Sequence, residues 1–293
     1  MKFRGVGTAL ITPFKRDGSL DEAGLQKFVD WQVSEGINFL VPCGTTGENP
    51  TLSAEEHRRV VEITIKSANG RVPVLAGAGS NSTEKAVELA KQAVDLGADG
   101  ILTITPYYNK PTPDGLLLHF GAQADALEKK KSGFPMIMYN VPGRTGLNMT
   151  AETTLRMAKE IPNIAGVKEA SANMEQILTI LRERPKGFAV LSGDDAWTLP
   201  LLGAGADGVV SVASNEVPRL MREMVDRRDV AIHNRLLPLL LGNFIESNPG
   251  PVKAALKMMG VIENDTMRPP LAPMADSSRK KIEAILRDAG LLK

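Results

Sequence analysis

Short apolar runs alternate with stretches of helical periodicity along most of the chain. Each run is nearly continuous in Val, Ile, Leu, Ala and Met, and a segment with helical spacing of apolar residues follows it. Such runs are typical of parallel strands that are buried on both faces of a sheet. The eight runs cover residues 6–12, 37–42, 73–79, 100–106, 135–141, 164–170, 188–193 and 208–214. Eight strand-and-helix units predict an α/β fold, a (β/α)8 TIM barrel.

The alternation stops after residue 215. From there to the end, segments rich in Leu, Met, Lys and Arg continue at helical spacing, with prolines between them. No Gly/Ser-rich linker separates these segments from the strands, so a flexibly tethered module is not indicated. We therefore expect a (β/α)8 barrel catalytic domain over residues 1–230 and a C-terminal helical extension, packed on the barrel, over residues 231–293.

Two Ser-x-x-Glu patterns indicate where helices begin. Ser19 and Glu22 form the first pattern, and Ser53 and Glu56 form the second. In a capping box the serine side chain bonds a backbone amide of the first turn, and the glutamate side chain bonds the serine amide in return. Both patterns follow an apolar run, so they support the predicted order of strand and helix.

Composition removes several classes of function. The chain has 293 residues, with 35 basic and 34 acidic side chains, so no overall positive field attracts nucleic acid or an anionic membrane. Cys43 is the single cysteine, which excludes an internal disulfide and favours a reducing compartment, the cytoplasm. No apolar run approaches the roughly 18 residues of a membrane span, and the N-terminus lacks the pattern of an export signal.

The sequence indicates no cofactor and no metal. His57, His119 and His233 lie far apart in the chain and form no i, i+4 ligand pair, so surface or packing roles are expected for them. Residues 203–208 match the G-x-G-x-x-G pattern, but they precede an apolar run. The glycine loop of a dinucleotide site follows a strand and opens a helix, so this match is a false positive.

Lys168 is the most informative candidate for chemistry. In a barrel of this kind the reactive groups sit at the C-terminal ends of the strands, and Lys168 lies in the second half of the sixth run. Strand alternation puts Gly166 and Lys168 on one face and Ala165 and Val167 on the other, so Lys168 points into the barrel if Val167 meets the helices. Desolvation there favours the neutral, nucleophilic amine that imine formation needs. The alternative is a structural ion pair with Glu169 or another carboxylate.

Tyr139 and Arg144 follow at the end of the fifth run. A phenol at the mouth of the barrel can pass a proton to and from a carbinolamine, and a guanidinium just beyond it suits a substrate carboxylate. Core packing of Tyr139 and a solvated loop position for Arg144 are the competing interpretations.

The loop after the second run reads Cys-Gly-Thr-Thr-Gly-Glu over residues 43–48. Its adjacent hydroxyls, Thr45 and Thr46, lie between glycines, where free backbone amides in a tight turn could hold a small carboxylate. No Gly-Lys-Ser/Thr follows, so this is not a Walker loop. A bare turn is the competing interpretation, and Cys43 is most simply a small apolar strand residue.

Taken together, these motifs resemble those of the dihydrodipicolinate synthases (4-hydroxy-tetrahydrodipicolinate synthases), in the class I pyruvate-dependent aldolase superfamily of N-acetylneuraminate lyase. The resemblance covers nearly the whole chain and is specific as a constellation, although each piece alone is weak. The matching segments are residues 44–48, 105–109, 139–145, 166–169, 192–195 and 248–253.

The resemblance implies a lyase that condenses pyruvate with L-aspartate 4-semialdehyde, the first committed step of the diaminopimelate route to lysine. It implies that Lys168 forms a Schiff base with pyruvate and that Tyr139 donates and accepts protons. Thr45 and Tyr108 would complete a proton relay with Tyr139, and Tyr108 would come from across a subunit interface.

The resemblance also implies the binding residues. Thr46, with backbone amides of its loop, would bind the pyruvate carboxylate, and Arg144 would receive the carboxylate of the semialdehyde. Gly193 and the main chain at Val210 would line the same pocket. No cofactor or metal takes part, and the expected assembly is a homotetramer, a dimer of dimers.

Other functions remain open on the sequence. Sister enzymes with the same lysine include N-acetylneuraminate lyase, 2-keto-3-deoxygluconate aldolase and 4-hydroxy-2-oxoglutarate aldolase; Arg144 and the Thr45–Thr46 pair favour the synthase. The intact set of Lys168, Tyr139, Thr45 and Arg144 argues against a catalytically silent regulator. A phosphate-binding barrel isomerase would need a Gly-rich helix start after the eighth run, which residues 211–218 lack.

The resemblance also bears on feedback inhibition. Many bacterial members are inhibited by lysine at the dimer interface through a His and a Glu, and this chain has Ala54 and Lys85 at the matching places. Asn81, His57 and Tyr107 are kept. Because Lys85 should repel the ammonium of lysine, we expect weak or absent inhibition.

Overall fold

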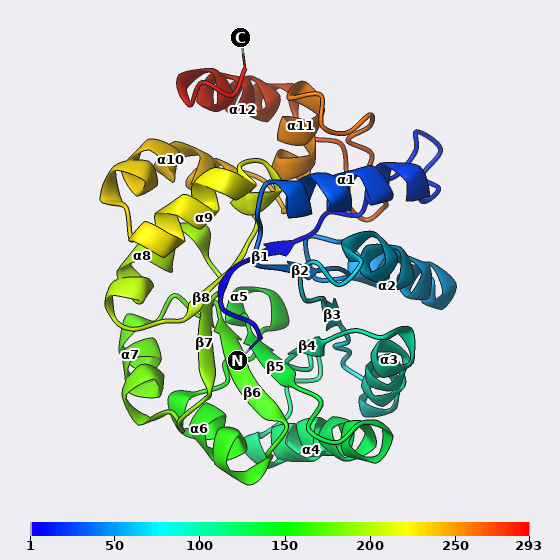
Figure 1. Cartoon of the computed structure of the whole chain (residues 1–293), viewed down its shortest axis with the longest axis vertical. Coiled ribbons are helices and arrows are strands. Elements are labelled where there is room, and N and C mark those ends of the chain that lie inside the picture. Colours follow the sequence, from blue (N-terminus) through cyan, green and yellow to red (C-terminus); the bar gives the residue numbers. More distant parts are fainter. Residues whose placement is uncertain (1, 293) are drawn as a thin grey trace.

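The eight apolar runs form eight parallel strands at the predicted places. The computed structural model describes residues 2–292, and in it the strands stand side by side within a ring of helices (Figure 1). The strands are β1 (Gly5–Ala9), β2 (Phe39–Val41), β3 (Leu75–Gly77), β4 (Gly100–Ile104), β5 (Met136–Asn140), β6 (Ile164–Glu169), β7 (Ala189–Ser192) and β8 (Gly208–Ser211). Each strand is shorter than its apolar run, because residues at one or both ends of the run lie in the loops. The predicted (β/α)8 TIM barrel is confirmed.

The barrel closes between β2 and β3 through a narrow contact. The hydrogen-bonded order runs from β2 through β1 and β8 down to β3. Leu40 and Val74 form an isolated parallel bridge, and the Gly77 amide donates to the Pro42 carbonyl at 2.9 Å. A Cβ on Gly77 would lie 2.1 Å from the carbonyl oxygen of Cys43. Only glycine permits this approach, which packs the end of β3 against the loop after β2.

Among residues 2–292, eight helices form the ring, one short helix lies at the C-terminal ends of the strands and three further helices form the extension. The ring contains α1 (Glu22–Ser34), α2 (Ala54–Ala68), α3 (Thr83–Leu96), α4 (Pro113–Lys130), α6 (Ala151–Glu160), α7 (Met174–Glu183), α8 (Asp195–Gly203) and α9 (Pro218–Arg227), and the short helix is α5 (Pro142–Thr145). The extension contains α10 (Val230–Gly242), α11 (Gly250–Met258) and α12 (Asp276–Asp288), and the 3-10 turns are η1 (Asn49–Thr51) and η2 (Ala213–Asn215). No helix within residues 2–292 combines the length and apolar character of a membrane span.

Two apolar layers are separated by the strands. The larger cluster lies between strands and helices and includes Val167, whereas the smaller one fills the barrel and includes Ile137, Leu191 and Val210. Strand β6 therefore turns Val167 outward, as predicted. The predicted alternation is wrong for Ala165, which packs against the inner cluster. The pairing of β6 with β5 shifts register there, so Ala165 is an extra residue in the ladder.

The capping predictions have opposite outcomes. At Ser53 the capping box is confirmed, with the Ser53 side chain accepting from the Glu56 amide and Glu56 accepting from the Ser53 amide. The box at Ser19 is wrong: α1 starts later, with Asp21 as the N-cap accepting from the Gly24 amide. Leu20 forms an antiparallel bridge with Phe14, which keeps this segment extended and leaves the cap to the next acceptor.

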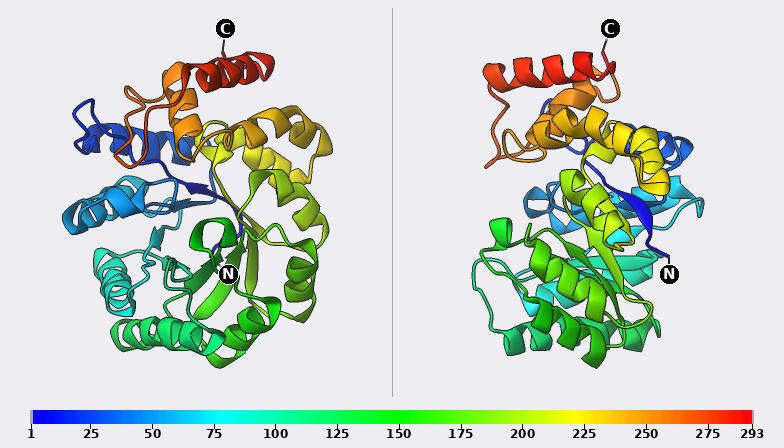
Figure 2. Two further views of the ribbon diagram at one scale, coloured as in Figure 1. Left: turned by 180° about the vertical axis from the view of Figure 1, so that it is seen from behind. Right: turned by 90° about the vertical axis from the view of Figure 1, so that its left-hand side faces the viewer.

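The C-terminal extension covers one side of the barrel. Helix α10 packs against α8 and α9, and α12 packs against α10 and α11. Figures 1 and 2 show α11 and α12 outside the ring, beside α1 and α10. The division at residue 230 falls at the start of α10. The assignment of residues 1–230 and 231–293 to two domains stays a prediction.

Two buried carboxylates lie behind the end of β8. Glu216 is 2% exposed and accepts a hydrogen bond from Asn243 Nδ2 at 2.7 Å. Asp195 accepts from the amides of Val212 and Ala213 at 2.9 and 2.8 Å. Burial raises the pKa of Glu216 well above its usual value, and the nearby charge of Asp195 raises it further.

Glu216→Gln is expected to stabilise the protein increasingly as pH rises. The folded state holds a proton on Glu216 that the unfolded chain releases near pH 4.5, so the stability from this group is lost as pH rises through the folded pKa. Between those two pKa values, the free energy of unfolding of the variant should increase relative to that of wild type by up to about 1.4 kcal/mol per pH unit. Thermal denaturation at pH 5, 7 and 9 measures this. A stability difference that stays constant with pH would contradict a neutral Glu216.

Candidate active site

A cavity of about 240 Å³ opens at the C-terminal ends of β2 to β5. Barrel enzymes carry their chemistry at this end. Its walls come from the loop after β2, the ends of β3 and β4, Tyr139 of β5 and the one-turn helix α5. The lining residues are Cys43, Gly44, Thr45, Asn49, Pro50, Gly77, Gly79, Leu102, Ile104, Tyr107, Tyr139, Arg144 and Thr145.

Lys168 lies on the inner face of β6, beside this cavity. Its side chain is buried, with the residue 6% exposed, and Nζ lies 4.2 Å from the centroid of the Tyr139 ring. Tyr139 and Lys168 are register partners on neighbouring strands. A cation above an aromatic ring is held by the negative face of the ring. The lysine is therefore placed against the phenol that the sequence also selected.

Lys168 is not held by a carboxylate among the described residues, since none lies within ion-pair distance of Nζ. Its neighbour Glu169 faces the opposite side of the strand, where Asn140 and Gln176 donate to its carboxylate at 3.1 to 3.2 Å and the Ser171 amide donates at 2.7 Å. The alternative of a Lys168–Glu169 ion pair is therefore wrong. Strand alternation explains this, because adjacent side chains point to opposite faces.

Gly193 makes room for the lysine. It follows β7, and its amide donates to the Glu169 carbonyl at 2.8 Å. A Cβ on Gly193 would lie 2.6 Å from Cβ of Ala170 and 3.2 Å from Cε of Lys168. A larger residue would clash with Ala170 and press against the lysine stem. Val210 of β8 lies in the barrel interior and is 1% exposed.

The loop at residues 44–48 is a tight turn at the cavity edge. The Gly47 and Glu48 amides donate back to Gly44 and Thr45 at 3.1 Å, and the Thr12 hydroxyl donates to the Gly47 carbonyl at 2.7 Å. Among residues 2–292, no group accepts from the amide of Thr45 or of Thr46. Two free amides in a fixed turn can bind one carboxylate.

The predicted site residues occupy different positions relative to the cavity. Thr45 and Arg144 line it, and Arg144 is exposed on α5, without an ion pair to any described residue. Thr46 is not one of the lining residues and is 2% exposed. Tyr108 stands apart: it is 88% exposed and has a left-handed backbone with φ of 73°, and within one chain it does not line the cavity.

His57 and His119 occupy packing positions and do not line this cavity. His57 is buried with Nε2 2.9 Å from the Gly77 carbonyl oxygen, and His119 is buried with Nδ1 2.9 Å from the Thr83 hydroxyl. Burial lowers the pKa of both rings, that of His119 to about 4. A packing role, one of the two expected, fits the neutral form of each ring.

Sequence reasoning missed the polar residues that support the cavity from outside. Asn248 donates from Nδ2 to the Thr46 hydroxyl at 3.0 Å, and Lys253 pairs with Glu48 in a fully buried ion pair. The only signal in the sequence was the resemblance at residues 248–253, which carried no role. Neither contact follows from periodicity, because about 200 residues separate the partners.

Comparisons with known proteins agree with this geometry. The model of the dihydrodipicolinate synthetase family matches residues 2–289. The 4-hydroxy-tetrahydrodipicolinate synthase of Koribacter versatilis is 53% identical over 301 residues, which span 100% of this chain and 98% of that protein.

Solved structures give the same answer. The crystal structure of dihydrodipicolinate synthase from Thermotoga maritima superimposes with a TM-score of 0.95 at 41% identity and covers 100% of both chains. The chloride-inhibited synthase from Acinetobacter baumannii, complexed with pyruvate, has a TM-score of 0.94 at 42% identity and covers 99% of both. The chain belongs to the dihydrodipicolinate synthetase family.

Proposed function

We propose that this protein is a lyase that condenses pyruvate with L-aspartate 4-semialdehyde to give 4-hydroxy-tetrahydrodipicolinate. This is the first committed step of lysine and diaminopimelate biosynthesis. The relatives with that name match over the whole chain at about half identity, which favours the synthase over the sister aldolases. Cys43 is buried and unpaired, and a single free thiol fits a reducing compartment, so we propose a cytoplasmic location.

The placement of Lys168 carries the proposal. It is a buried lysine without a carboxylate partner among the described residues, set against Tyr139 at the mouth of a barrel. An amine that attacks a carbonyl must be free of an ion pair, and none of the described carboxylates pairs with Lys168. The relative solved with pyruvate supports pyruvate as the first substrate.

The reaction then proceeds through covalent intermediates on Lys168. The amine adds to the ketone of pyruvate, and the carbinolamine loses water to give an iminium. Loss of a proton from the methyl carbon gives the enamine, whose carbon attacks the aldehyde of the second substrate. The amine of that substrate then closes the ring on the imine carbon and releases Lys168. Each proton transfer needs a donor and acceptor beside the imine, and Tyr139 is the group in contact with Lys168.

A second copy of the chain would complete the proton relay. Thr45 and Tyr139 share the cavity wall, but Tyr108 projects outward with 88% of its surface exposed. A tyrosine held outward in a left-handed conformation suits insertion into a neighbouring subunit. We propose that Tyr108 enters the partner's site within a tight dimer, and that two dimers form a homotetramer.

The carboxylates of the two substrates would bind at separate places. Thr46 and the free amides of its loop would hold the carboxylate of pyruvate, next to Lys168. Val210 and Gly193 would line the floor. Arg144 would bind the carboxylate of the semialdehyde, because its guanidinium is exposed at the cavity edge and unpaired among the described residues.

Borohydride trapping tests the proposed chemistry. Protein incubated with pyruvate and sodium borohydride should gain the mass of one reduced pyruvate adduct, and peptide mapping should place it on Lys168. Turnover of aspartate semialdehyde should exceed cleavage of sialic acid and of ketodeoxygluconate. Labelling of another residue, or no labelling, would overturn the mechanism; faster cleavage of either sugar acid would overturn the substrate.

Arg144→Ala is expected to separate the two substrates. The variant should be trapped with pyruvate as wild type is, while the KM for the semialdehyde rises by about 10- to 100-fold, since a charge-assisted contact to a carboxylate is lost. Steady-state kinetics with each substrate varied in turn measure this. Arg182→Ala is the matched control, because Arg182 lies on α7 and is exposed. Loss of pyruvate trapping in Arg144→Ala would show that Arg144 is needed for pyruvate and would contradict its assignment to the semialdehyde.

Weak feedback by lysine is expected. Lys85 is exposed at the start of α3, and its charge contributes to lowering the pKa of His57, after the larger effect of burial. The positive charge of Lys85 should therefore repel the ammonium of lysine near His57. Initial rates measured with added lysine should be nearly unchanged below 1 mM. Potent inhibition at submillimolar lysine would contradict this, and Lys85→Glu should increase the inhibition.

A further inference from the structure

The C-terminal extension reaches the 44–48 loop at two points. Asn248, in the turn before α11, donates to the Thr46 hydroxyl at 3.0 Å. Lys253, on α11, pairs with Glu48 at the other end of the loop. Both contacts are buried: Asn248 is 5% exposed, and Lys253 and Glu48 are 0% and 2% exposed. The extension therefore forms the outer support of the loop whose inner side faces the cavity.

The direction of the Asn248 bond determines what Thr46 can do. A hydroxyl has one proton to donate and lone pairs to accept with. Because Asn248 Nδ2 donates to Thr46 Oγ1, a lone pair is used on that side and the proton points elsewhere. No described residue accepts that proton. The Thr46 proton therefore stays available to an acceptor in front of the loop, such as a carboxylate.

Glu48 fixes the far end of the loop in an unfavourable conformation. Its backbone is left-handed, with φ of 53°, which costs free energy for a residue with a side chain. Its carboxylate is bound by Lys253 and by the Arg268 amide at 3.1 Å. Lys253 also donates to the Thr266 carbonyl at 2.8 Å. These contacts stabilise the left-handed backbone of Glu48, which is unfavourable in the absence of tertiary contacts.

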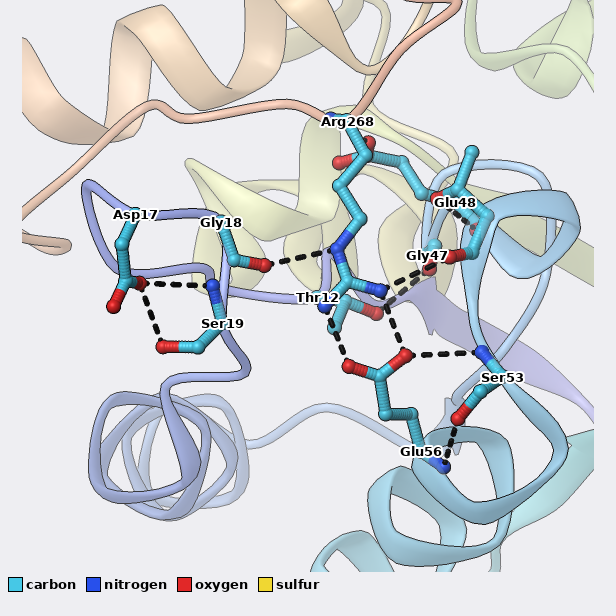
Figure 3. Close-up of polar contacts among 10 residues, drawn as sticks. Thr12, Asp17, Gly18, Ser19, Gly47, Glu48, Ser53, Glu56 and Arg268 are labelled. Atoms are coloured by element: carbon cyan, nitrogen blue, oxygen red, sulfur yellow. Dashed lines mark hydrogen bonds and ion pairs between the residues drawn. The ribbon is translucent and has the colours of Figure 1, made fainter.

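Arg268 extends this support to the start of α2. Its guanidinium bonds Glu56 and donates to the Gly18 carbonyl at 2.9 Å (Figure 3). It also donates to the Thr51 carbonyl at 2.9 Å. The Arg268 bond lowers the pKa of Glu56 to about 2, so the pair is charged at neutral pH. Lys253 and Arg268 both lie 4.3 Å from the ring of Phe14. The segment that follows the 44–48 loop is thus fixed from the same side.

We propose that Asn248 is a positioning residue for pyruvate binding: it orients the Thr46 hydroxyl so that its proton is presented to the substrate carboxylate. The extension then contacts the 44–48 loop at two residues. At Thr46 it orients the hydroxyl, and at Glu48 it fixes the backbone conformation. This inference rests on the proposed function, in which pyruvate forms an imine at Lys168.

The experiment measures borohydride trapping as a function of pyruvate concentration. Asn248→Ala should raise the pyruvate concentration for half-maximal trapping about tenfold, which corresponds to about 1.4 kcal/mol, and leave the KM for the semialdehyde unchanged. Asn248→Asp keeps the shape of the side chain, accepts the Thr46 proton and adds a negative charge, so it should raise the value further. Lys257→Met is the matched control, because Lys257 lies on α11 and pairs only with Asp265 among the described residues.

A double substitution separates orientation from general support. In a Thr46→Val background no hydroxyl remains to orient, so adding Asn248→Ala should raise the half-saturation concentration no further. An equal rise in both backgrounds, or a change below twofold in Asn248→Ala, would overturn the inference. A lower value in Asn248→Ala would show that Asn248 accepts from Thr46 and withholds its proton. Absence of trapping in wild type would instead overturn the proposed function. The melting temperature of each variant reports folding separately.

Discussion

Lys168→Ala is expected to abolish borohydride trapping and to lower turnover by at least about 1,000-fold, because the proposed covalent intermediate forms on the Lys168 amine. The amine is needed in every step from carbinolamine to ring closure, so its loss cannot be compensated by tighter substrate binding. Lys168→Arg should fail equally, since it keeps a positive charge in the barrel but does not form an imine. The pair of variants separates nucleophilic catalysis from electrostatic attraction.

A surface lysine provides the control. Lys186 is exposed before β7, at the end of the barrel away from the cavity, and Lys186→Ala should keep wild-type trapping and turnover. Intact-mass spectra after reduction with pyruvate give the labelled fraction for each variant. Trapping of Lys168→Ala at wild-type level would show that another amine reacts. Turnover retained in Lys168→Arg would show that the charge alone suffices.

The direction of Lys168 could be predicted because strand alternation is a local rule. In β6 the branched Val167 packs between strands and helices, so the next residue must point into the barrel. The same rule failed at Ala165, where a register shift against β5 inserts an extra residue. A bulge depends on the pairing with the neighbouring strand, so it cannot be predicted from the apolar run of β6 alone.

Helix starts show the same division between local and distant causes. The capping box at Ser53 follows from four consecutive residues and was predictable. At Ser19 the same spacing occurs, but the bridge between Phe14 and Leu20 holds the segment extended and Asp21 becomes the cap. A tertiary contact selected between two adequate local acceptors.

The contacts that support the 44–48 loop could not be predicted from the sequence, because they join residues far apart in the chain. Asn248 lies in the turn before α11 and Lys253 lies on α11, outside every predicted strand, and both contact residues about 200 positions earlier. Sequence spacing gives no information at that distance. Tyr108 is a related case, because it is exposed in the single chain and its proposed role in the proton relay requires a second chain.

Lys253→Met is expected to destabilise the fold by about 3 kcal/mol, because it leaves the Glu48 carboxylate buried without its cation. Replacing both partners, with Lys253→Met and Glu48→Gln together, should recover most of this loss, since a neutral pair of similar shape avoids the desolvation cost of both charges. Thermal denaturation at one protein concentration measures the four proteins. For a chain of this size the single variant should melt roughly 10 °C below wild type.

The two single variants should respond differently to pH. Burial already lowers the pKa of Lys253, and Glu48→Gln removes the carboxylate that opposes this, so the folded variant loses its proton more readily than the unfolded chain. Its stability deficit should therefore shrink as pH rises. In Lys253→Met no lysine remains at this position to lose a proton, so its deficit should not shrink as pH rises. Parallel pH profiles for the two variants, or a double variant less stable than both, would show that shape and not charge dominates this contact.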